Sequence, residues 1–124
     1  MASRLDGAGV AKLATLDDAL TQVQRVHSLV ERMASASQSK QDTGQMRQQI
    51  QRAASPLVGL LKPQFGMIAD QISQMILILT RAGGDQMKVR AMREGVAQVR
   101  TQLEISMAKV REQHTIKGGA SEFP

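Results

Sequence analysis

The two histidines, His27 and His114, are the residues of this chain best suited to chemistry, because the chain has no cysteine. The lack of cysteine excludes disulfides, thiolate metal ligands and cysteine nucleophiles. Neither histidine belongs to a Glu-x-x-His pair, and the chain has no Gly-x-Ser-x-Gly elbow and no phosphate-binding loop motif. The sequence therefore predicts no cofactor, no metal site, no catalytic residue and no small-molecule substrate, and we expect a protein that is not an enzyme.

His27 interrupts a series of apolar residues in the stretch "LDDALTQVQRVHSLVERM", residues 16–33. A ring at such a position is expected to be buried, neutral and hydrogen-bonded within the core. A histidine phosphotransfer bundle that uses His27 is an alternative function, but it needs a ring that a phosphodonor can reach. Such modules usually carry a lysine or glycine soon after the histidine, whereas Val30 and Glu31 follow here.

His114 lies in the last turn of the last predicted helix, within "REQHTIK". A cation at a helix C-terminus interacts favourably with the helix dipole. We therefore interpret His114 as a structural residue.

The composition predicts an all-α chain. Phe65 and Phe123 are the only aromatic residues apart from the histidines, whereas β-strands favour aromatic and β-branched side chains. Alanine, leucine, methionine, glutamine, arginine and lysine, which are good helix formers, dominate the sequence. The longest apolar run, "MILIL" at 75–79, is far shorter than the ~20 residues of a membrane span, and no signal peptide is visible. We expect a soluble, cytoplasmic protein.

Four segments place apolar residues at alternating spacings of three and four, which is typical of helices that pack along a seam. Thr15 is predicted to cap the first segment and "SASQSK" to end it, Pro56 is predicted to kink the second, and Pro63 and Asp85 are expected to begin the third and fourth. The third is expected to be the most buried helix. The predicted core residues are Leu16, Leu20, Val23, His27, Val30 and Ala34, then Met46, Ile50, Ala53, Leu57 and Leu60, then Phe65, Ile68, Ile72, Met75 and Leu79, and last Val89, Met92, Val96, Val99, Leu103, Ser106 and Val110.

The predicted architecture is an antiparallel four-helix bundle with a kinked second helix and a long C-terminal helix, formed by residues 15–114 as one domain. Residues 1–14 are expected to be a flexible N-terminal segment and residues 115–124 a flexible C-terminal tail. Arg93 and Arg100 flank the seam of the last helix on the side that corresponds to Asp17 and Glu31 on the first. These opposite charges are expected to face each other across an antiparallel pair.

The last segment also carries the predicted partner-binding residues. Its thirty positions span about 45 Å against about 30 Å for the other helices, so one end is expected to overhang. An overhanging helix end with apolar side chains beside its seam favours contact with a partner helix or a second copy. The sequence thus predicts a protein-protein interaction module. Its expected contact residues are Ile105, Met107, Val110 and Ile116, rimmed by Arg100 and Arg111, with Phe123 in the tail.

Binding of nucleic acid is the other alternative, because the net charge is +5. Arg93, Arg100 and Arg111 lie within about 20° of one another on a helical wheel and so form a stripe that phosphates can contact. Arg90 and Lys109 add to this stripe. The sequence has no set of aromatic side chains that could form a platform for base stacking, which makes this function less favoured than interaction with a protein.

Overall fold

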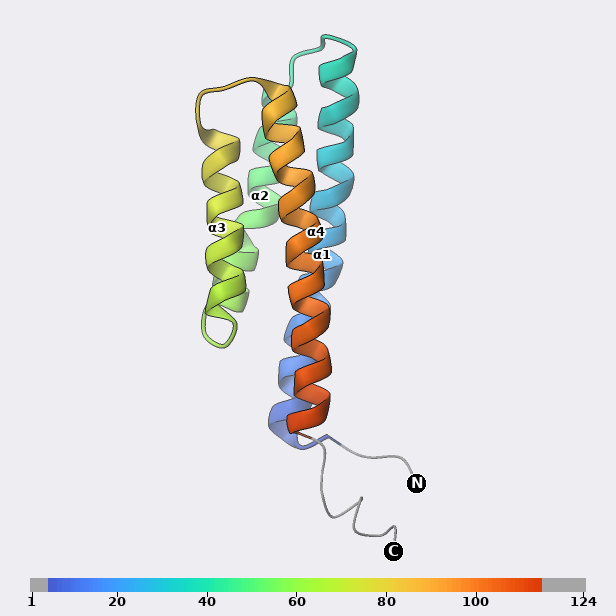
Figure 1. The fold of residues 1–124 in the computed structure, drawn as a ribbon, viewed down its shortest axis with the longest axis vertical. Helices are drawn as coiled ribbons and strands as arrows, with labels where there is room; N and C mark the ends of the chain where they lie inside the picture. The colour runs from blue at the N-terminus through green and yellow to red at the C-terminus, as the bar shows by residue number, and fades with distance from the viewer. Residues whose placement is uncertain (1–4, 115–124) are drawn as a thin grey trace, which may run out of the picture.

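The computed structural model describes residues 5–114, and all the regular elements in this range are helices (Figure 1). They are α1 (Gly7–Gln38), α2 (Gly44–Leu61), α3 (Gly66–Thr80) and α4 (Asp85–Gln113). The prediction of an all-α chain is confirmed. Within the described range, no helix combines the length and the apolar character needed to cross a membrane.

The helices lie lengthwise against one another, and each contacts two others. The contacts run from α1 to α2, from α2 to α3, from α3 to α4 and from α4 back to α1. Figure 1 shows α1 and α4 continuing side by side past the loop that joins α2 to α3. The predicted overhang of a lone last helix is therefore wrong, because the first turns of α1 cover the end of α4.

The start of α1 corrects the prediction that residues 1–14 form a flexible segment. The helix begins at Gly7, because the Asp6 carboxylate accepts a hydrogen bond from the Gly9 amide at 2.6 Å. This bond satisfies one of the donors that a first helical turn leaves unpaired. Thr15, the predicted cap, lies inside α1, where its hydroxyl donates to the Ala11 carbonyl. Residues 1–4 and the predicted tail, 115–124, lie outside the described residues.

The buried face of α1 corrects the predicted burial of His27. The prediction matches the core at Leu16, Val23, Val30 and Ala34, and Leu20 packs partly buried against it, but the prediction places His27 in the core where Val26 is buried instead. Val26 is 2% exposed, whereas His27 is exposed to solvent. Valine and methionine gain more from burial than histidine, so α1 turns these residues inward. The buried apolar side chains of α1 are those of Leu16, Ala19, Val23, Val26, Leu29, Val30, Met33 and Ala34.

The seams of α2 and α3 are matched in part. In α2, Ile50, Ala53 and Leu57 are buried, but Leu61 takes the core position predicted for Leu60, which is 40% exposed. In α3, the buried residues include Ile68, Ile72, Met75 and Leu79, as predicted. This helix begins at Gly66 rather than at Pro63. One side of its apolar run faces solvent, since Leu77 is 45% exposed, so the core does not enclose this run on all sides.

The seam of α4 follows the prediction closely. The predicted residues Val89, Met92, Val96, Val99, Leu103 and Val110 are all buried, and Ser106 is half-buried. Gly95 lies beside this seam and is also buried. A β-carbon at Gly95 would lie 2.6 Å from Cγ of Met75 on α3. The missing side chain of Gly95 thus makes room for Met75 where α3 packs on α4.

A polar network joins the start of α2 to the start of α4. The Thr43 hydroxyl donates to Asp85 Oδ2 at 2.8 Å, and Arg47 Nη1 donates to Asp85 Oδ1 at 3.1 Å. Asp85, the predicted cap of α4, is its first residue instead, and Gly84 occupies the cap position. Gly83 just before it has a φ of 145°, a backbone conformation that favours glycine. The network ties the two loops together at the end of the molecule opposite the start of α1 and the end of α4 (Figure 1).

Candidate functional site

The apolar contact residues predicted on α4 differ in burial. Val110 is 4% exposed and belongs to the core, so it cannot also contact a partner in the folded protein. Met107 is half-buried and packs against the core. Ile105 is 43% exposed and remains available for a contact. The correction at Val110 follows from the cover that the first turns of α1 provide.

The predicted rim residues also differ. Arg111 is exposed and Arg100 is half-buried. The Nε atom of Arg100 is buried and has no hydrogen-bond partner within the described part of the chain. Ile116 and Phe123, the remaining predicted contact residues, lie outside the described residues.

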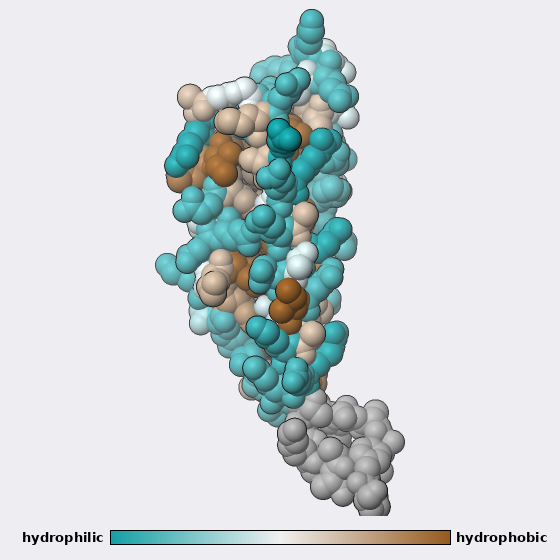
Figure 2. All heavy atoms as spheres, in the orientation of Figure 1, coloured by the Kyte–Doolittle hydropathy of each residue, from teal (hydrophilic) through white to brown (hydrophobic). Residues whose placement is uncertain are grey.

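A groove of about 340 Å³ lies where the start of α3 meets α4. Its apolar lining includes Phe65 and Ile68, and Met67 at its edge is 88% exposed. Figure 2 shows hydrophobic side chains exposed between hydrophilic ones on the face formed by α3 and α4. An exposed methionine beside a groove with apolar side chains in its lining is a feature of protein contact surfaces.

Polar residues from α4 complete this groove. Gln102, Ser106 and Lys109 line it from that helix, and Lys109 contributes the charged group of the lining. Ile105 is three residues after Gln102 and four before Lys109, which places it on the same side of the helix. Ile105 thus extends the apolar surface of the groove along α4.

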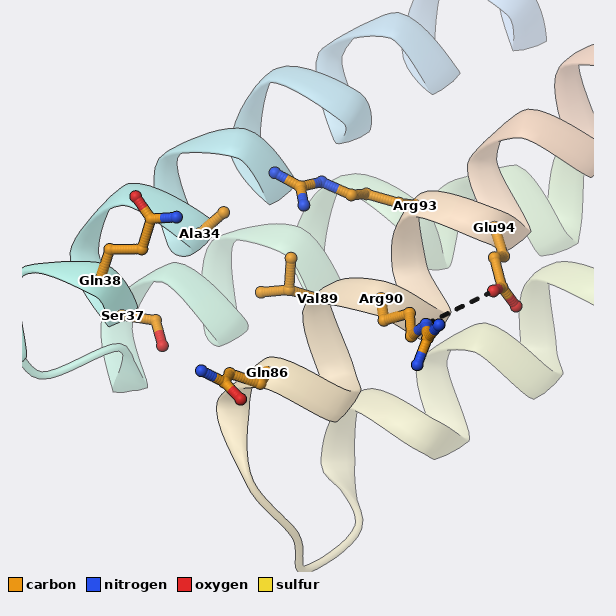
Figure 3. Close-up of a pocket in the computed structure, with 8 residues that line it drawn as sticks. All are labelled: Ala34, Ser37, Gln38, Gln86, Val89, Arg90, Arg93 and Glu94. Atoms are coloured by element: carbon orange, nitrogen blue, oxygen red, sulfur yellow. Dashed lines mark ion pairs between the residues drawn. The ribbon is translucent and has the colours of Figure 1, made fainter.

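The basic stripe predicted for nucleic acid is partly neutralised by carboxylates. A second hollow, of about 260 Å³, lies between the end of α1 and the start of α4. Arg90 and Glu94, which are among its lining residues in Figure 3, form an ion pair at 4.0 Å. Arg93 on the same helix pairs with Glu31 of α1. Lys109 and Arg111 lie farther along α4 and are exposed. Pairing of Arg90 and Arg93 weakens the field that a phosphate backbone would meet.

The ion pair between Glu31 and Arg93 was predicted from the charges that flank the two seams. Arg93 Nε donates to Glu31 Oε2 at 2.8 Å, and Arg93 Nη2 donates to Oε1 at 2.7 Å. These hydrogen bonds lower the pKa of Glu31, with smaller contributions from the charges of Arg93 and His27, while partial burial opposes the shift. The geometry is the two-point contact that guanidinium and carboxylate groups favour.

Glu31→Gln should reduce the acid sensitivity of folding. The folded-state pKa of Glu31 lies below its ordinary value, so the pair stabilises the fold above the pKa of the unfolded chain. That stability is lost as the pH falls through the folded-state pKa. We expect the variant to show a smaller fall in unfolding free energy across this acid range, measured by denaturant titration at several pH values. An unchanged pH dependence would contradict a stabilising role for the pair.

His27 is accessible to a phosphodonor, as the phosphotransfer alternative requires, but its surroundings do not favour a phosphoryl group. Its ring is exposed, so burial does not prevent a phosphodonor from reaching it. However, Glu31 stands one turn later on α1, and the pKa of Glu31 is lowered in part by the charge of His27. A phosphoryl group on this ring would add negative charge close to a carboxylate, which is unfavourable.

His114 forms a three-residue cluster with Asp6 and Lys12 at the end of the α1 and α4 pair. Its Nδ1 atom lies 3.2 Å from Asp6 Oδ1, and its Nε2 atom lies 3.1 Å from Lys12 Nζ. The Asp6 amide also donates to the His114 carbonyl at 2.9 Å. A carboxylate only accepts hydrogen bonds and an ammonium only donates them, so a ring with its hydrogen on Nδ1 and a lone pair on Nε2 matches both neighbours.

The surroundings of Asp6 favour its charged form. The hydrogen bond from the Gly9 amide lowers the pKa of Asp6 most, and His114 and Lys12 lower it further, while partial burial opposes them. Gly9 also makes room for the cluster, since a β-carbon there would lie 2.5 Å from Cβ of His114. The carboxylate is thus held as an anion beside the imidazole.

Sequence reasoning missed this cluster. Asp6 and Lys12 lie within residues 1–14, which were expected to be flexible. No sequence motif links them to a histidine near the other end of the chain. Asp6 ahead of a run rich in alanine and leucine is the N-cap signal that could have revealed the earlier helix start. Across residues 5–114, no group of three or more histidine, cysteine, aspartate or glutamate residues is placed to hold a metal ion.

No protein-family model matches this chain, and no curated protein or solved structure matches it either. The chemistry and shape of its own surface are therefore the basis for a functional proposal.

Proposed function

We propose that the protein is a non-enzymatic helical interaction module that self-associates through the groove between α3 and α4. The observation that carries this proposal is the position of Met67, which is 88% exposed at the edge of a groove of about 340 Å³ whose lining combines apolar and polar side chains. Burial of such a side chain in a second copy would remove apolar surface from water at both sites.

A two-fold contact uses the same surface on both copies. Met67 and the groove lie side by side on one surface, so a two-fold axis nearby lets each copy insert its methionine into the groove of the other. Methionine suits this role because its flexible thioether adapts to irregular apolar hollows. Ile105, on the groove side of α4, would add to the contact.

The charges around the groove are complementary in such an arrangement. Asp70 is exposed on α3, three residues after Met67 and therefore on the same side of the helix. Lys109 lines the groove from α4. When Met67 enters the groove of the second copy, Asp70 approaches Lys109 of that copy. Charge pairs at the rim of an interface fix the orientation more than they add affinity.

The proposed scaffold for this surface is an antiparallel four-helix bundle in which α2 bends at Pro56. Short connections at 39–43, 62–65 and 81–84 support the reversal of direction between successive helices. Pro56 lies inside α2, where it cannot donate to the carbonyl one turn earlier, which supports a bend. The bundle would hold the start of α3 rigidly against α4.

Sedimentation analysis of the full chain over micromolar concentrations tests the proposal. The wild type should shift from monomer to dimer as the concentration rises. Met67→Glu should weaken dimerisation at least about tenfold, because it loses apolar burial of about 1.5–3 kcal/mol and places a charge in the groove. Met87→Glu is the matched control, since Met87 is 53% exposed on the first turn of α4.

Reversal of the proposed charge pair gives a second readout. Asp70→Lys and Lys109→Asp should each weaken the dimer, and the double variant should recover part of the loss. A wild type that stays monomeric throughout, or a Met87→Glu variant as impaired as Met67→Glu, would overturn self-association through this groove.

A further inference from the structure

We propose that Lys12 is an acyl-acceptor site, activated by His114 and Asp6, that takes acyl groups from activated donors such as thioesters and acyl phosphates. This site is separate from the interaction surface of α3 and α4. It lies near the start of α1, at the end opposite the loop to α2. It concerns modification of this chain and not turnover of a substrate.

The cluster has the order of groups found where a base activates a nucleophile. The amine of Lys12 is 3.1 Å from Nε2 of His114, and Nδ1 of the same ring is 3.2 Å from the Asp6 carboxylate. A nucleophile within hydrogen-bond reach of a base, with the base oriented by a third group, is the general pattern of an activated nucleophile. Lysine stands here in the position that serine or cysteine takes in hydrolases.

The proton that keeps the amine of Lys12 unreactive can pass to Nε2 of His114. In the resting arrangement the ammonium donates to the free Nε2 lone pair of His114. Transfer of this proton leaves a neutral amine and an imidazolium ion, and the Asp6 carboxylate stabilises that cation through Nδ1. Asp6 is itself held as an anion by the Gly9 amide, which accounts for its lowered pKa.

The reaction balances without any oxidant or reductant. The neutral Nζ of Lys12 attacks the carbonyl carbon of the donor, so a C–N bond forms. The C–S bond of a thioester, or the C–O bond of an acyl phosphate, breaks. The ammonium loses two protons in all: one passes through His114 to solvent and the other ends on the leaving group. The product is an uncharged amide at Lys12.

Lys12 differs from the other lysines of the described chain in its burial and in its contact with an imidazole. Lys40, Lys62 and Lys109 are exposed, and Lys88 is 5% exposed. Within residues 5–114, Lys12 is the lysine whose ammonium contacts an imidazole. It is half-buried, so a donor can reach it. The charged groups that contact the ring are Asp6, the N-cap of α1, and Lys12, while Arg111 precedes His114 by three residues on α4.

The test is competitive acetylation of the full chain by acetyl phosphate near neutral pH, with the initial rate at each lysine measured by peptide mass spectrometry. We expect Lys12 to react about tenfold faster than Lys62 and Lys109, a modest share of the effect that general bases have in enzymes. His114→Gln keeps a hydrogen-bond acceptor but cannot take up the proton, so the rate at Lys12 should fall to that of Lys62. Asp6→Asn keeps a helix cap and should give an intermediate rate.

The ratio of the rates at Lys12 and Lys109 provides a readout that a purely structural role of His114 would not change. The neutral amine of Lys12 forms by transfer of its proton to the neutral imidazole, so the rate at Lys12 levels off once His114 is neutral, whereas the rate at Lys109 keeps rising with pH. The ratio should therefore fall as the pH is raised above neutral in the wild type and stay constant in His114→Gln. Equal rates at Lys12 and Lys109 in the wild type, or a Lys12 rate that His114→Gln leaves unchanged, would overturn the proposal.

Discussion

Replacement of Val26 by aspartate is expected to lower the free energy of unfolding by more than about 4 kcal/mol, which is close to the whole stability of many small domains. Val26 is 2% exposed and faces a space between all four helices, together with Leu57, Ile72 and Val96. A carboxylate there would lose its hydration and find only apolar neighbours. We therefore expect a protein that is largely unfolded in buffer.

His27→Asp is the matched control for this prediction. It introduces the same side chain one position along, on the exposed side of α1. The expected change is within about 0.5 kcal/mol, as for most surface substitutions. Denaturant unfolding followed by circular dichroism measures both variants. If His27→Asp destabilises the protein as much as Val26→Asp, the ring of His27 belongs to the core and α1 does not turn Val26 inward in its place.

The contrast between α1 and α4 shows what the spacing of apolar residues can predict. In α4, charged or small polar residues stand beside most seam positions, for example Arg93 after Met92 and Arg100 after Val99, so one rotation of the helix buries the apolar set. In α1, two choices are available at successive steps, such as Val26 or His27. The spacing of apolar residues is compatible with either residue in the core, and the helix turns inward the side whose side chains pack better.

The site was predictable only where local spacing determines it. The pairing of Glu31 with Arg93 follows from charges that flank two seams, and that prediction is confirmed. Ile105 was also identified as an apolar residue beside a seam. By contrast, the groove depends on where α3 begins, and the contact of Asp6 with His114 depends on the pairing of two chain ends. Neither arrangement is encoded in a short stretch of sequence.

Gly95→Ala is expected to destabilise the protein by about 1–2 kcal/mol, although alanine favours helices by about 1 kcal/mol over glycine. A β-carbon at Gly95 would lie 2.6 Å from Cγ and 2.7 Å from Sδ of Met75. Met75 is 6% exposed and enclosed by the core, so it must leave its position or push α3 away from α4. Such overpacking typically costs about 1–3 kcal/mol, which outweighs the gain in helix propensity.

Gly59→Ala provides the control, because it makes the same substitution inside α2 at a site where nothing lies within 4 Å of the added β-carbon. There the gain in helix propensity is unopposed, and the unfolding free energy should rise by about 0.5–1 kcal/mol. The two variants should therefore shift thermal and denaturant midpoints in opposite directions. Because the chemical change is identical, the difference between them measures the contact of Gly95 with Met75. A Gly95→Ala variant as stable as Gly59→Ala would mean that α3 and α4 do not approach closely at this point.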